Sequence, residues 1–216
     1  MEKIKQVDSN YLPQHLIMIL GITSLWLFIP STYELVINIY NLEYNIVKIL
    51  IYIYINFVSV ISLICWYKWL ITNIHYSIWY YLDRIFSSIL FCILFVLSIF
   101  NNSCIYDIIL PLFIVISYIC GKMCYNYSKY NLSVFCHLFF RYLGFIWTCY
   151  ILLNNFSYNY LTILTIIYWL HIIYLLYIYN NLDCNTTLEC KKNKYIKESL
   201  ILFIIIITCL IIKFLL

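Results

Sequence analysis

The chain has 216 residues, of which 65% are hydrophobic and only 10% are charged, and its formal net charge is +4. Soluble domains carry about 25% charged residues, so this composition excludes an ordinary soluble globule. The small positive charge, with no basic patch interleaved with aromatic residues, also excludes a nucleic-acid-binding protein. We therefore expect one all-α domain over residues 1–216, a polytopic bundle of transmembrane helices surrounded by the lipid bilayer.

The expected membrane spans follow one another along the whole chain. A crossing helix needs about 20 mostly apolar residues, and seven segments approach that length: 14–32, 46–66, 77–99, 105–120, 133–153, 160–179 and 199–216. The first lacks the small-residue cleavage site that follows a signal peptide, and the fourth is short and contains Pro111. We expect an outer loop over 33–45 and a polar loop over 180–198.

Lysine and arginine are distributed unequally between the two sides of this seven-span arrangement. The side with the N-terminus carries Lys3, Lys5, Lys68, Arg84, Lys122, Lys129, Lys191, Lys192, Lys194 and Lys197, whereas the other carries only Lys48 and Lys213. Because cytoplasmic loops are enriched in these residues, we expect the N-terminus in the cytoplasm and the C-terminus outside. No feature of the sequence assigns the chain to a particular membrane or oligomeric state.

The fifth span carries its polar residues on one face. Five residues spaced three or four apart share one side of this helix: Ser133, His137, Arg141, Gly144 and Thr148. A charge in mid-membrane costs about 2.5–3.5 kcal/mol, so Arg141 and its neighbour His137 are candidates for a functional site. In the alternative interpretation, Arg141 binds helix-end carbonyls or extends its side chain to the cytoplasmic interface.

The third span contains an aspartate whose depth depends on where the helix begins. If the helix begins near Tyr76, Asp83 lies about 10 Å inside it at 1.5 Å per residue. A buried carboxylate needs a partner, and Arg141 is the best candidate. If the helix begins at Ile85 instead, Asp83 and Arg84 form an ordinary pair at the interface.

Histidines supply the remaining candidate ligands. His171 lies between two tyrosines in the sixth span, where it is either a hydrogen-bonded core residue or a metal ligand. Counted from the cytoplasmic ends of their spans, Asp83, Arg141 and His171 lie at one level. His137 lies one turn nearer the cytoplasm and His75 at the surface, so the sequence permits an inward-facing polar cluster with zinc held by His75, His137 and His171.

The stretch from Ser62 to Leu90 resembles the progestin/adiponectin receptor and hemolysin III group of the CREST superfamily. That group has Ser-x-x-x-His late in its second helix and Leu-Asp near the start of its third, and this chain has Ser62 and Leu82-Asp83. It departs from the pattern at Trp66, where the histidine is expected, and by lacking the two histidines of the last helix. The resemblance implies a seven-helix membrane protein, N-terminus inside, related to zinc-dependent lipid hydrolases.

Three functions are compatible with these residues, and no motif of soluble catalysis is present. The leading hypothesis is a membrane-embedded hydrolase of a lipid substrate, for which zinc is a candidate cofactor. In it Asp83 acts as acid, base or water orienter, His137 is a zinc ligand or proton carrier, and Arg141 holds an anionic head group. The alternatives are a transporter for an ion, proton or small solute, and a structural or assembly protein whose polar residues only pack helices.

Overall fold

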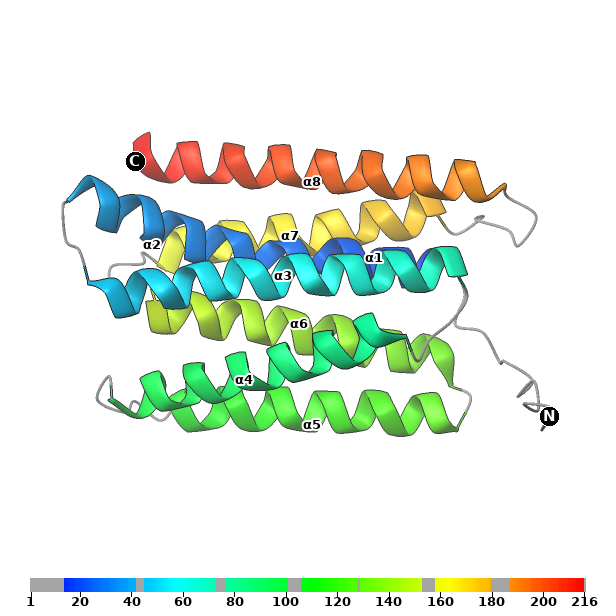
Figure 1. Cartoon of the computed structure of the whole chain (residues 1–216), viewed down its shortest axis with the longest axis horizontal. Coiled ribbons are helices and arrows are strands. Elements are labelled where there is room, and N and C mark those ends of the chain that lie inside the picture. The colour runs from blue at the N-terminus through cyan, green and yellow to red at the C-terminus, as the bar shows by residue number, and fades with distance from the viewer. Residues whose placement is uncertain are drawn as a thin grey trace.

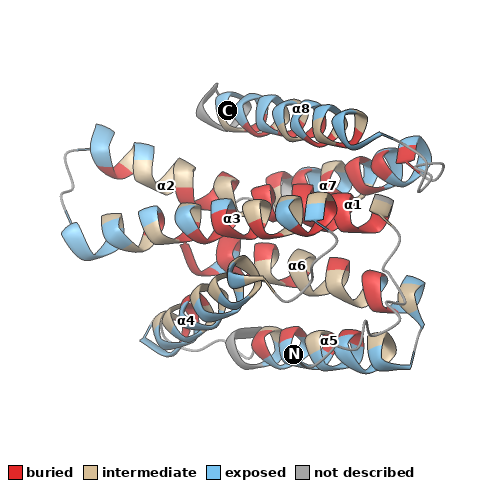
Figure 2. Ribbon diagram, turned by 45° about the vertical axis from the view of Figure 1, so that its right-hand side comes forward, coloured by how far each residue is buried: buried red, intermediate tan, exposed pale blue. Residues whose placement is uncertain are grey.

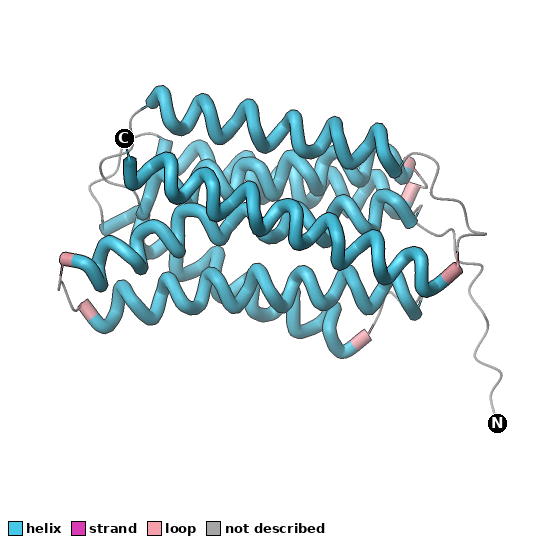
Figure 3. Tube along the Cα trace, turned by 90° about the horizontal axis from the view of Figure 1, so that it is seen from above, coloured by secondary structure: helices cyan, strands magenta, loops and turns pink. Residues whose placement is uncertain are grey.

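The computed structural model describes residues 14–41, 45–72, 77–100, 106–127, 129–152, 158–179 and 187–215. In chain order the helices are α1 (Gln14–Thr23), η1 (Ser24–Leu27), α2 (Phe28–Tyr40), α3 (Ile46–Thr72), α4 (Ile78–Phe100), α5 (Tyr106–Asn126), α6 (Tyr130–Leu152), α7 (Tyr158–Tyr179) and α8 (Leu188–Leu215). All regular structure in these ranges is helical (Figure 3). The expected all-α fold is confirmed.

Six helical stretches in the described part of the chain are long and apolar enough to cross a membrane: Leu16–Tyr40, Ile46–Thr72, Ile78–Phe100, Ile109–Asn126, Tyr130–Leu152 and Tyr160–Tyr179. They correspond to the first six expected spans. The seventh expected span falls in the second half of α8, a 28-residue helix. The chain is thus a multi-pass helical bundle, and its seventh span stays a prediction.

The helices lie side by side along the long axis of the molecule, and successive long helices point in opposite directions (Figure 1). α1 is the central helix, because it contacts α3, α6, α7 and α8. Of the first span, 78% is buried inside the protein, compared with 17% of α4. Figure 2 shows this difference as buried residues gathered on α1 and exposed residues along α4 and α5.

The outer surface of the bundle is strongly apolar. Large aliphatic and aromatic side chains are exposed on several helices, among them Leu50, Ile53, Ile99, Leu170 and Phe203. In water such a continuous apolar surface would drive aggregation. On α3, α4, α7 and α8 the exposed apolar surface is extensive, as expected for helices that face lipid.

A short 3-10 turn interrupts the first span. η1 precedes Pro30, which lies in the first turn of α2 and has no backbone N–H to donate to the preceding turn. The tighter turn accommodates that missing hydrogen bond. The interruption leaves Thr23 and Ser24 buried at the middle of the span.

Two of the expected loops are partly helical, which corrects the sequence interpretation. Within 33–45, α2 continues to Tyr40, since Asn38 Nδ2 donates to the carbonyl of Glu34 over 2.7 Å and α2 packs on α3. Within 180–198, α8 begins at Leu188. Its polar first half is helical because it packs on other helices: Tyr179 of α7 donates a hydrogen bond to Glu198 over 2.6 Å.

Candidate functional site

Arg141 of α6 points into the centre of the bundle. Its Nη1 donates to Thr23 Oγ1 of α1 and its Nη2 to Ser62 Oγ of α3, both over 3.3 Å. Its guanidinium also lies over the ring of Trp66, 5.3 Å from the centroid, which is within the range of a cation–π interaction. Arg141 therefore joins three helices and does not extend to the interface.

Asp83 reaches the same place from α4. That helix begins at Ile78, so Asp83 lies inside it, as the first of the two interpretations of this span expected. Its carboxylate has hydrogen-bond contacts with Ser62 and Ser87 and interacts electrostatically with Arg141. The other carboxylate oxygen, Oδ1, is buried without a hydrogen-bond partner.

Ser62 thus lies between the two charged residues. An Arg141 N–H donates to its oxygen, which leaves the Ser62 O–H free to donate to Asp83. A buried carboxylate or guanidinium without a partner is strongly destabilising, whereas a hydrogen-bonded pair is tolerated. The hydroxyl links the charges of α4 and α6 through α3.

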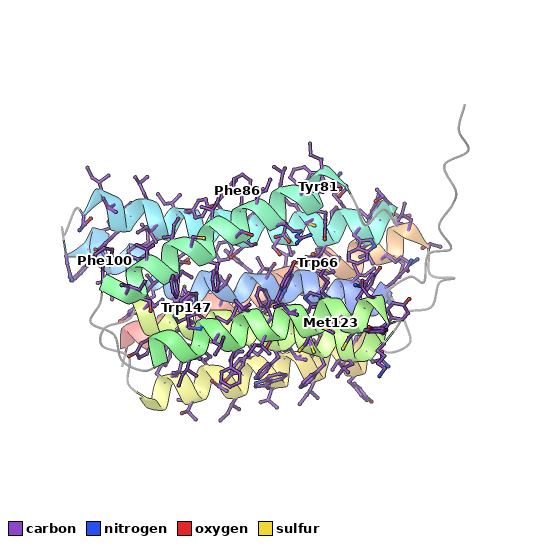
Figure 4. All side chains as sticks on the ribbon, turned by 90° about the horizontal axis from the view of Figure 1, so that it is seen from below. Trp66, Tyr81, Phe86, Phe100, Met123 and Trp147 are labelled. Atoms are coloured by element: carbon purple, nitrogen blue, oxygen red, sulfur yellow. The ribbon has the colours of Figure 1, made fainter. Side chains whose placement is uncertain are left out.

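These residues line one end of a cavity of about 140 Å³. Its polar end has Thr23, Ser24, Ser59, Ser62, Asp83, Ser87 and Arg141, and its other end is lined mainly by Leu90, Leu94, Ile114, Phe145 and Trp147. Figure 4 shows how far apart two tryptophans of this region lie along the bundle: Trp147 is nearer to Phe100, and Trp66 is nearer to Tyr81. Along α4 the polar residues Asp83 and Ser87 precede the apolar residues Leu90 and Leu94, so the cavity is polar toward the start of α4 and mainly apolar toward its end.

The volume of the cavity limits what it can hold. One water takes about 30 Å³ of liquid, and a dry cavity of about 150 Å³ accepts a molecule the size of benzene. The cavity can therefore hold a few waters, or one polar group with its first methylenes. A whole lipid would have to extend beyond it.

The other residues on the polar face of α6 lie in two different environments: Ser133 and His137 in one, and Gly144 and Thr148 in the other. Gly144 and Thr148 line the cavity with Arg141. Ser133 donates to the carbonyl of Gly121 on α5 over 2.8 Å, and the ring of His137 lies edge-on to Tyr118 with centroids 6.2 Å apart. The structure therefore does not bring His137 to the cavity with Asp83 and Arg141.

His171 lies in the core beside Trp26. Trp26 Nε1 donates to His171 Nδ1 over 3.4 Å, and His171 Nε2 is buried without a hydrogen-bond partner. Trp26 lines the cavity and His171 does not. These contacts favour the hydrogen-bonded core histidine over the metal ligand.

Of the three zinc ligands expected from the sequence, His137 and His171 fall within the described ranges. His75 lies outside the described residues. Within the described ranges, no three His, Cys, Asp or Glu side chains form a group that could hold a metal ion. His137 packs against Tyr118 of α5, and His171 packs against Trp26 of η1.

Sequence reasoning did not find Thr23, Ser87 or Trp66 as parts of the site. Thr23 and Ser87 carry a weak signal, since each is a hydroxyl residue inside an apolar span. Trp66 stands out in the sequence only as a departure from the Ser-x-x-x-His pattern. Its contact with Arg141 depends on how α3 and α6 face each other, which the sequence does not reveal.

The fold and site define a multi-pass helical membrane protein with a charged, hydrogen-bonded centre. Comparisons of the chain with protein-family models, with curated proteins and with solved structures found no match. A more particular function must therefore be argued from the cavity itself.

Proposed function

We propose that the protein is a membrane-embedded hydrolase that cleaves an ester of a lipid, with Ser62 as the nucleophile. The observation that carries the proposal is the position of Ser62 Oγ. It accepts a hydrogen bond from Arg141 over 3.3 Å, contacts the Asp83 carboxylate, and opens onto a cavity whose other end is apolar.

These three residues suit nucleophilic catalysis. A serine hydroxyl is a weak nucleophile until a neighbouring base takes its proton, and Asp83 is placed to do so. As Ser62 Oγ attacks the ester carbonyl carbon, the electron pair of the C=O bond moves onto its oxygen. The N–H donors of Arg141 stabilise that oxyanion, which is worth most in a site of low polarity.

The same residues complete the reaction. Collapse of the tetrahedral intermediate breaks the ester C–O bond, and the leaving alcohol takes its proton from Asp83. A water activated by Asp83 then hydrolyses the acyl group from Ser62. The zinc ligands expected from the sequence take part in no step of this scheme.

The shape of the cavity and the sequence resemblance support this scheme. The cavity accommodates an ester group and the first methylenes of a chain, and α4, which lines it, is the least buried of the spans. A lipid chain would leave the cavity beside α4 and enter the bilayer. Ser62 and Asp83 are also the residues that carry the resemblance to the progestin/adiponectin receptor group.

We further propose seven spans with the N-terminus in the cytoplasm, which places Asp83 and Arg141 in the cytoplasmic half of the membrane. Figure 1 supports this, because α3, α5 and α7 end where α1, α4, α6 and α8 begin. Lys68, Lys122, Lys129 and Lys191 belong to that end, and Lys48 belongs to the other. α8 runs the full length of the bundle between the two ends.

The proposal is tested with a fluorophosphonate carrying a long alkyl chain, which reacts covalently with activated serines. We expect mass spectrometry of the purified protein in lipid nanodiscs to find the probe on Ser62. Labelling should disappear in Ser62→Ala and fall at least tenfold in Asp83→Asn. It should persist in the control Ser98→Ala, whose serine is buried on α4. A folded wild-type protein that does not label at Ser62 would rule the hydrolase out.

A further inference from the structure

A line of buried and partly buried polar residues runs along one face of α3, from the Asp83 cavity toward the start of that helix. Going outward from Ser62, its members are Ser59, Asn56 and Tyr52, spaced three, three and four residues apart. At 1.5 Å per residue, neighbouring members are separated by about 4.5–6 Å along the helix. Ser59 and Tyr52 are 1% and 4% exposed.

The facing helices supply a second line of polar groups at the same levels. Ser24 Oγ donates to the carbonyl of Ser59 over 3.3 Å. One level farther out, Ser31 Oγ donates to Asn56 Oδ1 over 2.6 Å, and Asn56 Nδ2 lies 3.5 Å from Thr32 Oγ1. Polar groups therefore meet across the contact between η1–α2 and α3 at each level.

The outer end of this line reaches a second carboxylate. Tyr52 has side-chain hydrogen bonds to Asn38 and Glu34 and interacts electrostatically with Glu34. Asn38 is 5% exposed, whereas Glu34 is partly exposed. We call the whole set the α2–α3 polar seam: Ser24, Ser31, Thr32, Glu34, Asn38, Tyr52, Asn56 and Ser59.

The inner end of the seam carries an unused acceptor. Asp83 Oδ1 is buried without a hydrogen-bond partner and belongs to the cavity that Ser24 and Ser59 also line. The serine hydroxyls of the seam also donate within their own helical segments: Ser24 to the carbonyl of Gly21 over 2.6 Å, Ser31 to that of Leu27 over 2.8 Å and Ser59 to that of Ile55 over 3.1 Å. Their oxygens are left as acceptors for water. A seam that carries water needs a further acceptor at its inner end, because each buried water requires two to four polar partners.

We infer that the α2–α3 polar seam is a proton path, completed by bridging waters, between Glu34 near the outer end of the bundle and Asp83 in the cavity. Hydroxyl groups suit this role because each can donate and accept at once, and a single water bridges polar groups about 5–6 Å apart. The titratable side chains along the path are Glu34, Tyr52 and Asp83, and Arg141 is the fixed cation at its inner end. The inference does not depend on Ser62 acting as a nucleophile.

The test measures proton flux into liposomes that contain the full-length protein. A trapped pH-sensitive dye reports the flux, and a potassium gradient with valinomycin drives it. We expect the wild type to exceed empty liposomes at least tenfold, and Asn56→Leu and Asp83→Asn to return the flux to background. The control Ser117→Ala changes a buried serine of α5 outside the seam and should conduct as the wild type does.

Tyr52→Phe separates a blocked path from a misfolded protein, because it removes only the hydroxyl. We expect it to lower the flux at least threefold while keeping a wild-type melting temperature. Wild-type flux equal to that of empty liposomes would overturn the inference, as would undiminished flux in both Asn56→Leu and Tyr52→Phe. Asn56→Leu should still label at Ser62, so the proton path and the hydrolase can fail separately.

Discussion

The hydroxyl of Tyr195 on α8 lies against Gly21 on α1, in the space that a methyl group on that glycine would occupy. The same hydroxyl donates to the carbonyl of Leu63 on α3 over 2.8 Å. A side chain at position 21 would also meet Trp66 Cβ at 2.8 Å. The absence of a side chain at this one position therefore brings α1, α3 and α8 together.

Gly21→Ala should separate these helices. The added methyl group must displace Tyr195 and press on Trp66, and overpacking of this kind costs about 1–3 kcal/mol. We expect a lower midpoint of thermal unfolding in detergent. Gly144→Ala is the matched control, because a Cβ there meets nothing within 4 Å, and the alanine should leave the midpoint unchanged or raise it. Equal midpoints for the two variants would contradict the close packing at Gly21.

Asp83 and Arg141 should behave as a coupled pair in a double-mutant cycle. Asp83→Asn or Arg141→Met alone leaves one buried charge uncompensated, which costs about 3–5 kcal/mol. We expect the double variant to be more stable than the sum of the two single losses predicts, as measured by unfolding in mixed micelles. Additive losses would mean that the two charges do not interact.

His171 should contribute to the core and not to metal binding. Trp26→Phe removes the N–H donor to its Nδ1 and should cost about 0.5–1.5 kcal/mol, the usual net value of a hydrogen bond. We expect His171→Ala to leave the zinc content of the purified protein unchanged, as measured by atomic emission against wild type, His75→Ala and His137→Ala. Loss of zinc in His171→Ala would restore the metal site expected from the sequence.

The number of spans can be tested at the two ends of the chain. If α8 crosses the membrane, the ends of the chain lie on opposite sides. We expect a protease-sensitive tag to be cleaved from outside sealed cells at the C-terminus but not at the N-terminus. Asn185, in the connection before α8, should remain unglycosylated. Cleavage of the tag at both ends, or at neither end, would place the two ends on the same side of the membrane and would mean that the chain has six spans.

The sequence predicted the helices well, because a membrane span is set by composition over a long window. Its errors came where polar residues continue a helix. Glu34 and Glu43 made 33–45 resemble a loop, although Glu34 lies within α2, where its carbonyl accepts a hydrogen bond from Asn38. Lysines and glutamates did the same in the first half of α8, where packing of Tyr195 and Glu198 on other helices favours the helix.

The charged residues of the candidate site were predictable from the sequence, whereas the places of the histidines were not. Arg141 and Asp83 stand out in any reading of the sequence, because charges are rare in spans and need partners. The positions of His137 and His171 depend on which helices are neighbours, and spacing along one helix does not determine that. The polar residues of α6 do share one face of that helix. α5 covers this face in the first turns of α6, and the cavity lies against it in the later turns.

The central place of α1 has a consequence for how the protein is made. α1 leaves the ribosome before α6, α7 and α8, yet these three helices help to enclose it. Until they are inserted, Thr23 and Ser24 must face lipid or the insertion machinery. A nascent chain that stops before α6 lacks Arg141, so the Thr23 hydroxyl has no charged partner until that helix is inserted.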